Sequence, residues 1–265
     1  MTKFKHGRAA LKRRDGRPQV PAVGESWLYG THAVLAAWSN PKRRCRRLLV
    51  TDQARANLAG GPLGVDRPPP EIVDKREIER HVPPGAVHQG MALLAEPVPE
   101  VSIEAFCREF DAIPEATVVV LDQPADPQNV GAVVRSASAF GASAVIMPNR
   151  RAPEATAALA KAASGALETT PLIRVSNLAR TLDLLKKAGF WCIGLDMAAG
   201  QRLADADLGG KAALVLGSEG EGLRRLTRET CDLLVRIPLS GPIESLNLSV
   251  SAAIALYETR RSRDS

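Results

Sequence analysis

The stretch TVVVLDQPADPQNVGAVVRSASAFG, residues 117–141, decides the fold class of this chain. It begins with a continuous apolar run, which is typical of a strand buried on both faces of a parallel sheet. A polar loop with two prolines follows, and then a stretch with the spacing of an apolar helix face. Strand, loop and helix in this order predict one unit of an α/β domain.

The same alternation continues from this unit to the C-terminus. The predicted strands are 143–148, 171–175, 191–197, 212–219 and 233–239. The predicted helices are 129–141, 154–168, 177–189, 222–231 and 245–261. This order predicts a parallel sheet with helices on both faces, in which ligands bind beyond the carboxyl ends of the strands.

Charge is distributed unevenly along the chain. Residues 1–97 hold 17 Lys and Arg against 9 Asp and Glu, whereas residues 98–265 hold 18 against 20. The basic residues gather in the first 19 positions and in the cluster Lys42, Arg43, Arg44, Arg46 and Arg47. A basic half joined to a near-neutral half indicates that one part binds a polyanion, and nucleic acid is the favoured partner. A solvated tail and a solvated helix end are the alternative.

The N-terminal half carries a smaller strand and helix pattern. Strands are expected at 46–51, 71–73 and 90–97, and helices at 29–38, 53–60 and 74–82. The resulting division is a disordered basic tail (1–20), a small α/β module (21–97), a linker with one short helix (98–116) and a second α/β domain (117–265).

Several classes of protein are excluded by composition. No apolar run is long enough to span a membrane, and the basic N-terminus lacks the apolar stretch of a signal peptide. The four cysteines are scattered and predict reduced thiols in a cytoplasmic protein. The four histidines show no metal-ligand spacing, so no metal site is expected.

Three polar segments follow predicted strands and should meet at one edge of the sheet: 123–141, 217–223 and 240–250. The glycine-rich loop GSEGEG matches neither the phosphate-binding GxxxxGK[ST] pattern nor GxGxxG. Its Glu219 and Glu221 would repel a pyrophosphate, so the loop favours an adenosine or amino-acid moiety, with an ordinary turn as the alternative.

Two further positions stand out in these segments. Arg135 lies among small and apolar residues, and we expect it to be buried and partnered rather than solvated. Ser245 stands where an apolar helix begins, and it is either an N-cap or part of a site.

The three segments resemble, in order and spacing, the motifs of the SpoU/TrmH branch of the SPOUT methyltransferases. They read DPQNVGAVVRSASAFGA, LVLGSEGEGLRRLTRETCD and IPLSGPIESLNLSVSAAIALYE. The N-terminal stretches YGTHAVLAAW and HQGMAL resemble the RNA-binding module of RlmB-type enzymes, which methylate a guanosine ribose of 23S rRNA.

The resemblance implies S-adenosylmethionine as cofactor, a deep trefoil knot and a homodimer formed through the C-terminal domain. It places the catalytic positions on Asn129, Arg135, Glu219, Ser245 and Asn247. It places backbone contacts to the cofactor on Gly217, Ile237 and Leu246.

Two roles remain open for Arg135. The resemblance implies a group that deprotonates the ribose hydroxyl, but a guanidinium normally stays protonated. The alternative is a charged clamp that holds a phosphate and stabilises the forming alkoxide, while the N-terminal module on a flexible linker delivers the nucleotide. A tRNA ribose methyltransferase and a non-catalytic ribosome-assembly protein are the other hypotheses for function.

Overall fold

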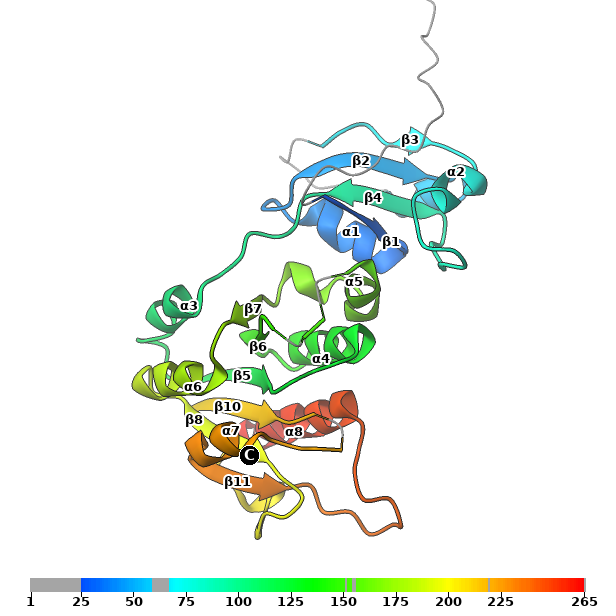
Figure 1. Ribbon diagram of the computed structural model, residues 1–265. Coiled ribbons are helices and arrows are strands. Elements are labelled where there is room, and N and C mark those ends of the chain that lie inside the picture. The colour runs from blue at the N-terminus through cyan, green and yellow to red at the C-terminus, as the bar shows by residue number, and fades with distance from the viewer. Residues whose placement is uncertain (1–24, 59–66, 151, 154–155, 219, 265) are drawn as a thin grey trace, which may run out of the picture.

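The computed structural model describes residues 25–58, 67–150, 152–153, 156–218 and 220–264. The described chain forms two sheets, a small one built from the N-terminal third and a larger one built from the rest (Figure 1). A connecting segment with the short helix α3 (Ile103–Glu109) runs between them.

The N-terminal sheet has the strand order β1-β4-β2-β3. Its strands are β1 (Ser26–Tyr29), β2 (Cys45–Val50), β3 (Glu71–Ile72) and β4 (Met91–Ala95). The helical elements are α1 (Thr31–Ser39), the 3-10 helix η1 (Ala54–Leu58) and α2 (Lys75–Glu79). The expected strands and helices of this half are therefore present, with β1 in addition and with the 3-10 helix η1 in place of the helix predicted at 53–60, of which residues 59 and 60 lie outside the described residues.

The C-terminal sheet has seven parallel strands in the order β7-β6-β5-β10-β8-β11-β9. They are β5 (Ala116–Leu121), β6 (Ala144–Pro148), β7 (Leu172–Val175), β8 (Trp191–Leu195), β9 (Gln201–Arg202), β10 (Lys211–Leu216) and β11 (Leu233–Arg236). The parallel α/β sheet expected from the sequence is confirmed, and only the two-residue strand β9 was not expected.

Helices cover both faces of this sheet, which explains why β5 and β10 are mostly apolar and are buried along nearly their whole length. The helices are α4 (Pro127–Ala139), α5 (Ala157–Ala163), α6 (Leu178–Lys187), α7 (Arg225–Thr230) and α8 (Leu248–Arg263). One core lies under α4, α5 and α8, and a second lies under α3 and α6. The central strands are therefore buried between the two cores.

The last helix begins later than its sequence pattern suggested. It starts at Leu248, and its N-cap is Asn247, whose Oδ1 accepts a hydrogen bond from the Ser249 backbone N–H at 2.8 Å. The prediction that Ser245 caps this helix is wrong, because the three residues from Ser245 to Asn247 precede the first helical turn. Ser245 is thereby left free to line the site described below.

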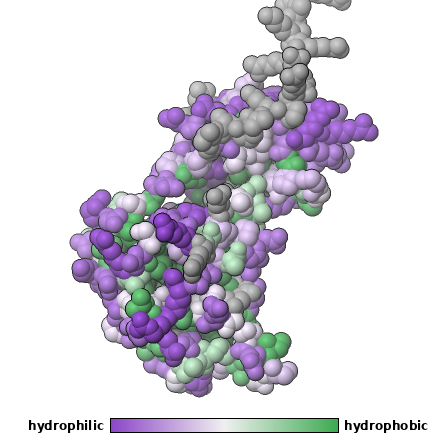
Figure 2. All heavy atoms as spheres, viewed as in Figure 1, coloured by the Kyte–Doolittle hydropathy of each residue, from purple (hydrophilic) through white to green (hydrophobic). Residues whose placement is uncertain are grey.

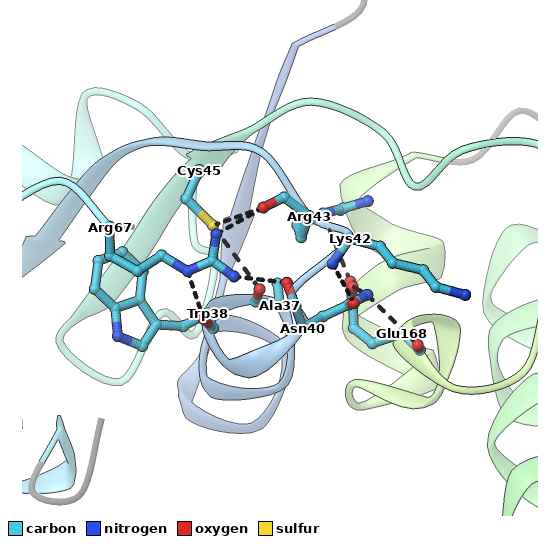
Figure 3. Close-up of polar contacts among 8 residues, drawn as sticks. All are labelled: Ala37, Trp38, Asn40, Lys42, Arg43, Cys45, Arg67 and Glu168. Carbon is cyan, nitrogen blue, oxygen red and sulfur yellow. Dashed lines mark hydrogen bonds and ion pairs between the residues drawn. The ribbon is translucent and has the colours of Figure 1, made fainter. Parts of the chain in front are cut away.

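The N-terminal domain is docked on the C-terminal domain through a largely buried polar cluster (Figure 3). Glu168, in the 3-10 helix η2 (Ala166–Glu168), accepts a 2.7 Å hydrogen bond from the Asn40 side chain. The same carboxylate lies 3.7 Å from Arg43 Nε, and both side chains are at most 7% exposed. In this structure the N-terminal domain is thus held against the C-terminal domain.

Arg67 completes this cluster from the N-terminal side. Its guanidinium donates to the backbone carbonyls of Trp38, Asn40 and Arg43 at 2.6–2.8 Å (Figure 3). The Trp38 carbonyl lies in the last turn of α1 and has no partner within the helix, so the cation both satisfies it and complements the helix dipole. The Asn40 and Arg43 carbonyls belong to the turn that follows α1. The turn that presents Asn40 and Arg43 to Glu168 is therefore rigid.

Helices α4 and α5 approach each other closely at Gly131. A Cβ at this position would lie 2.5 Å from the Leu159 carbonyl oxygen and 2.6 Å from the Ala162 Cβ. A helical glycine normally costs stability relative to alanine, so its presence here reflects the close contact between the helices.

We expect Gly131→Ala to lower the free energy of unfolding by about 1–3 kcal/mol, because the added methyl group has no space. The neighbouring change Ala132→Gly is the control, and it should cost about 1 kcal/mol through helix propensity alone. Thermal unfolding of both variants tests the prediction. A stabilised Gly131→Ala protein would show that the helices can move apart freely.

Candidate active site

Three loops, which follow β8, β10 and β11, meet at the carboxyl ends of the strands and line a cavity of about 450 Å³. A cavity of this size can hold a nucleoside-sized ligand. Its lining comprises residues 195–198, 216–218, 220–223, 228, 237, 244–246, 248 and 251. The predicted cofactor positions Gly217, Ile237 and Leu246 all lie in this lining, together with Ser245.

The glycine-rich loop after β10 forms a tight hairpin. Ser218 and Gly222 exchange two backbone hydrogen bonds of 3.1 Å. A Cβ on Gly217 would lie only 2.0 Å from the Gly222 carbonyl carbon, so no larger residue fits there. The hairpin exposes backbone groups to the cavity, as expected for a loop that contacts a ligand through its main chain. Glu219 lies outside the described residues.

Two ion pairs that the sequence reasoning missed hold these loops. Asp122 follows β5, is 1% exposed, and accepts from the Arg224 backbone N–H at 3.0 Å and from its Nε at 2.7 Å. Asp196 follows β8 and lies 3.0 Å from Arg228 Nε. An acid placed directly after an apolar strand was the available signal in both cases. The first pair connects the end of β5 to the start of α7, and the second connects the end of β8 to α7 itself.

The described charges around the cavity are mostly negative. Asp196, Glu221 and Glu244 contribute carboxylates, and Arg228 is the one described cationic residue of the lining. Because Arg228 is already paired with Asp196, two carboxylates remain to face a ligand. This balance disfavours a phosphate and favours a ligand with a positive charge.

Asn129 and Asn247 bring the first and third motifs together. The Asn247 Nδ2 donates to the Asn129 Oδ1 at 3.1 Å, which joins the start of α4 to the start of α8. Asn247 also caps α8, so its orientation is fixed from two sides. Asp126 caps α4 by accepting from Gln128 N at 2.9 Å, so the helix begins two residues before Asn129.

Arg135 is exposed, and the expectation that it is buried and partnered is wrong. Within α4 the buried side is formed by Val130, Val133, Val134 and Ala137, and Arg135 lies on the opposite side of the helix. Among the described residues no hydrogen bond or ion pair involves its side chain. Arg135 is therefore not assembled with Asn129 and Asn247 within one chain.

The basic cluster at 42–47 is divided between structural and surface positions. Arg43 is buried against Glu168, so it is not available to RNA in this structure. Arg47 forms a two-pronged pair with Glu71 at 2.9 and 2.8 Å, and Arg46 pairs with Glu25 and Glu96. Lys42 and Arg44 are exposed. The sequence cluster therefore offers fewer phosphate contacts than its composition suggested.

The remaining reactive groups are not arranged for catalysis. Burial raises the pKa of Cys192 to about 12, and it does the same for Cys231, so both thiols stay protonated at neutral pH. Within the part of the chain that the structure describes, no cluster of His, Cys, Asp and Glu is suited to hold a metal ion. The described helices include none with the length and apolarity needed to cross a membrane.

Two family models match the chain. The model of the SpoU rRNA methylase family matches residues 116–257, and the model for RNA 2'-O ribose methyltransferase substrate binding matches residues 27–101. The match of the larger model covers the sheet, the cavity and both Asn129 and Asn247.

Curated relatives resemble the chain over nearly its whole length. The 23S rRNA (guanosine-2'-O-)-methyltransferase RlmB of Coxiella burnetii is 41% identical, with 89% of this chain and 96% of the relative covered. The protein of the same name from Pseudomonas aeruginosa is 37% identical over the same shares of the two chains.

Solved structures share the fold. The SpoU methyltransferase AviRb of Streptomyces viridochromogenes, solved with the cofactor AdoMet, aligns over 92% of both chains with a TM-score of 0.76 and 24% identity. A solved RNA 2'-O ribose methyltransferase aligns over 91% of this chain and 90% of the other, with a TM-score of 0.74 and 25% identity. Taken with the site geometry and the family matches, these likenesses lead to one conclusion: the chain belongs to the SpoU rRNA methylase family.

Proposed function

We propose that this protein methylates the ribose 2'-hydroxyl of a guanosine in 23S rRNA, using S-adenosylmethionine as cofactor. The observation that carries the proposal is the acidic cavity at the strand ends, in which Gly217, Ile237, Ser245 and Leu246 lie together. The activity named for the curated relatives, which cover 89% of the chain, supplies the substrate class.

The cavity suits S-adenosylmethionine in both size and charge. When bound, this cofactor supplies a methyl group on a positively charged sulfur. The carboxylates of Glu221 and Glu244 would attract its cationic groups, while the backbone of the Gly217 hairpin and Leu246 would bind its adenine end. Leu195, Leu216 and Leu248 contribute an apolar part of the lining.

On the substrate side, the chain provides amides, a hydroxyl and a guanidinium. Asn129 and Asn247 hold each other and would orient the ribose, and Ser245 stands at the mouth of the cofactor cavity. We assign Arg135 the role of a charged clamp on the neighbouring phosphate, because its exposed planar fork can reach RNA directly. Glu219 is the remaining catalytic position that the family resemblance implies.

We further propose that the active form is a homodimer. The described part of α8 exposes Val250, Ile254 and Tyr257, which recur at helical spacing and form an apolar stripe along one side. Phe140, at the end of α4, packs edge-on against Tyr257 with a centroid separation of 6.2 Å. Pairing through this stripe would cover it and bring α4, with its exposed Arg135, close to the partner subunit.

The remaining parts of the proposal follow from the family. Residues 21–97 would bind the RNA, and residues 98–116 would connect the two domains. Residues 117–265 would form the methyltransferase domain, with a trefoil knot around the cavity. The free cysteines and the ribosomal substrate both favour a cytoplasmic location.

We expect S-adenosylhomocysteine to bind the wild-type protein in the presence of EDTA, as measured by isothermal titration calorimetry. Gly217→Ala should abolish this binding, because its methyl group would collide with the Gly222 backbone. Gly241→Ala is the control, since a Cβ there has no neighbour within 4 Å. A wild-type protein that binds only when metal is added would contradict the proposed site.

Arg135→Lys keeps the positive charge but loses the planar fork, and so it separates the two roles of Arg135. The clamp predicts a fall of about 100- to 1000-fold in single-turnover methylation of unmodified 23S rRNA at every pH between about 6 and 9.5. Binding of S-adenosylhomocysteine should not change. Partial activity that climbs with pH would instead favour a proton-accepting role, and full activity would remove Arg135 from catalysis.

We expect the full-length protein to sediment as a dimer at micromolar concentration and Ile254→Asp to sediment as a monomer. A buried charge in the apolar stripe is strongly unfavourable, whereas the same charge on an exposed surface costs little. Leu226→Asp is the matched control, because Leu226 is an exposed leucine on α7 outside the stripe. A wild-type monomer would rule out the dimer, and a dimeric Ile254→Asp protein would place the interface elsewhere.

A further inference from the structure

The N-terminal domain contains a second cavity, of about 520 Å³, remote in sequence from the motifs of the active site. Its walls come from η1, from α2 and from the loop 86–90 that precedes β4. Thr51, Ala54, His88 and Gly90 are buried and form its floor. A floor of small side chains and one imidazole, open above to solvent, leaves room for a planar group.

The rim of this cavity is polar and mixed in charge. Gln53, Asn57, Lys75 and Glu79 are exposed and contribute two amides, one cation and one anion. In the view of Figure 2, hydrophilic side chains gather over the part of the domain that carries α2. Because the charges of Lys75 and Glu79 cancel, a phosphate group has no net electrostatic attraction to this rim. A planar group whose edge carries both hydrogen-bond donors and acceptors matches the rim better.

His88 adds one defined donor to the floor. Its Nδ1 accepts a hydrogen bond from the Gly90 backbone N–H at 3.1 Å, so in the neutral ring the proton is on Nε2. Burial lowers the pKa of His88, which keeps the ring neutral at physiological pH. An Nε2–H group, a carboxylate and an ammonium group in one cavity match the carbonyl and the adjacent N–H groups of a purine edge.

The loop that forms one wall is tied to the catalytic domain. Lys161, on α5, donates a hydrogen bond to the Val87 carbonyl and lies 5.2 Å from the centroid of the Tyr29 ring. Helix α5 packs on α4, the helix that carries Asn129 and Arg135. In Figure 1 the loop before β4 lies on the side toward which β5 and β10 point. An RNA segment held at this loop therefore faces the same side of the molecule as the active site.

We propose that this cavity binds an unpaired nucleobase of the substrate RNA, with Glu79, Lys75 and Asn57 reading its edge. Sequence-specific recognition of RNA uses unstacked bases from loops and bulges, whose edges are hydrogen-bonded by side chains. The proposal rests on the function proposed above, and it identifies the place where the N-terminal domain recognises the sequence of its RNA substrate. The base that best matches a carboxylate next to two donors is guanine, which presents two adjacent N–H groups beside a carbonyl oxygen.

The test is the dissociation constant of full-length variants for unmodified 23S rRNA transcribed in vitro, measured by filter binding at fixed salt. Lys75→Ala and Arg76→Ala remove the same charge from adjacent positions of α2, but only Lys75 lines the cavity. We expect Lys75→Ala and Asn57→Ala to weaken binding about tenfold or more, and Arg76→Ala to weaken it no more than about twofold.

Glu79→Gln provides the sharpest contrast. Removing a negative charge tightens any binding that depends on charge alone, whereas loss of a base contact weakens it. The proposal predicts weaker binding, with unchanged S-adenosylhomocysteine affinity and unchanged thermal unfolding. Tighter binding by Glu79→Gln, or equal effects of Lys75→Ala and Arg76→Ala, would overturn it. A wild-type protein that methylates transfer RNA but not 23S rRNA would instead overturn the function proposed above. The comparison of variants tests only the base-binding cavity, so the two failures can be told apart.

Discussion

The pairing of β5 with β10 is the constraint on which the rest of the structure depends. These strands lie about ninety residues apart in the chain, and their parallel register sets Leu121 beside Leu216. Asp122 follows β5 and Gly217 follows β10, so the same register places these two residues side by side. The Asp122 N–H donates a hydrogen bond to the Leu216 carbonyl at 2.7 Å. Because both strands are buried on two faces, a slip in register would expose apolar residues and separate the two loops.

Short polar contacts between loops, which this register brings together, hold the residues of the site in place. The buried Asp122 holds Arg224, which sets the direction of the chain after the glycine hairpin. The contact between Asn129 and Asn247 joins two helix starts that are 118 residues apart. Each link connects loops from different strands, so the cavity forms only when the whole sheet is assembled. This dependence explains why the residues of the site are spread over three segments of sequence.

Much of the basic character of the N-terminal half stabilises the fold. Arg67 caps α1, and Arg43 pairs with Glu168 across the domain boundary (Figure 3). Arg47 pairs with Glu71. Burial lowers the pKa of Arg43, and the carboxylate of Glu168 opposes that effect, so each partner needs the other. Positive charge counted along a sequence therefore overstates the surface available to RNA. The rim of the second cavity, where Lys75 and Glu79 carry opposite charges, can distinguish RNA sequences better than the basic cluster at 42–47.

Local patterns in the sequence determined the fold class, the order of strands and helices and two of the three segments that line the cavity, because apolar periodicity and turn residues act over short distances. The sequence did not reveal that Arg135 is exposed, since its apolar neighbours turn toward the core on the other side of α4. It also suggested Ser245 as a helix cap, whereas the cap is Asn247. The partners of Arg43 and Asp122 lie more than a hundred residues away in each case. Such pairings depend on how the sheet and the two domains pack, and only the tertiary structure decides them.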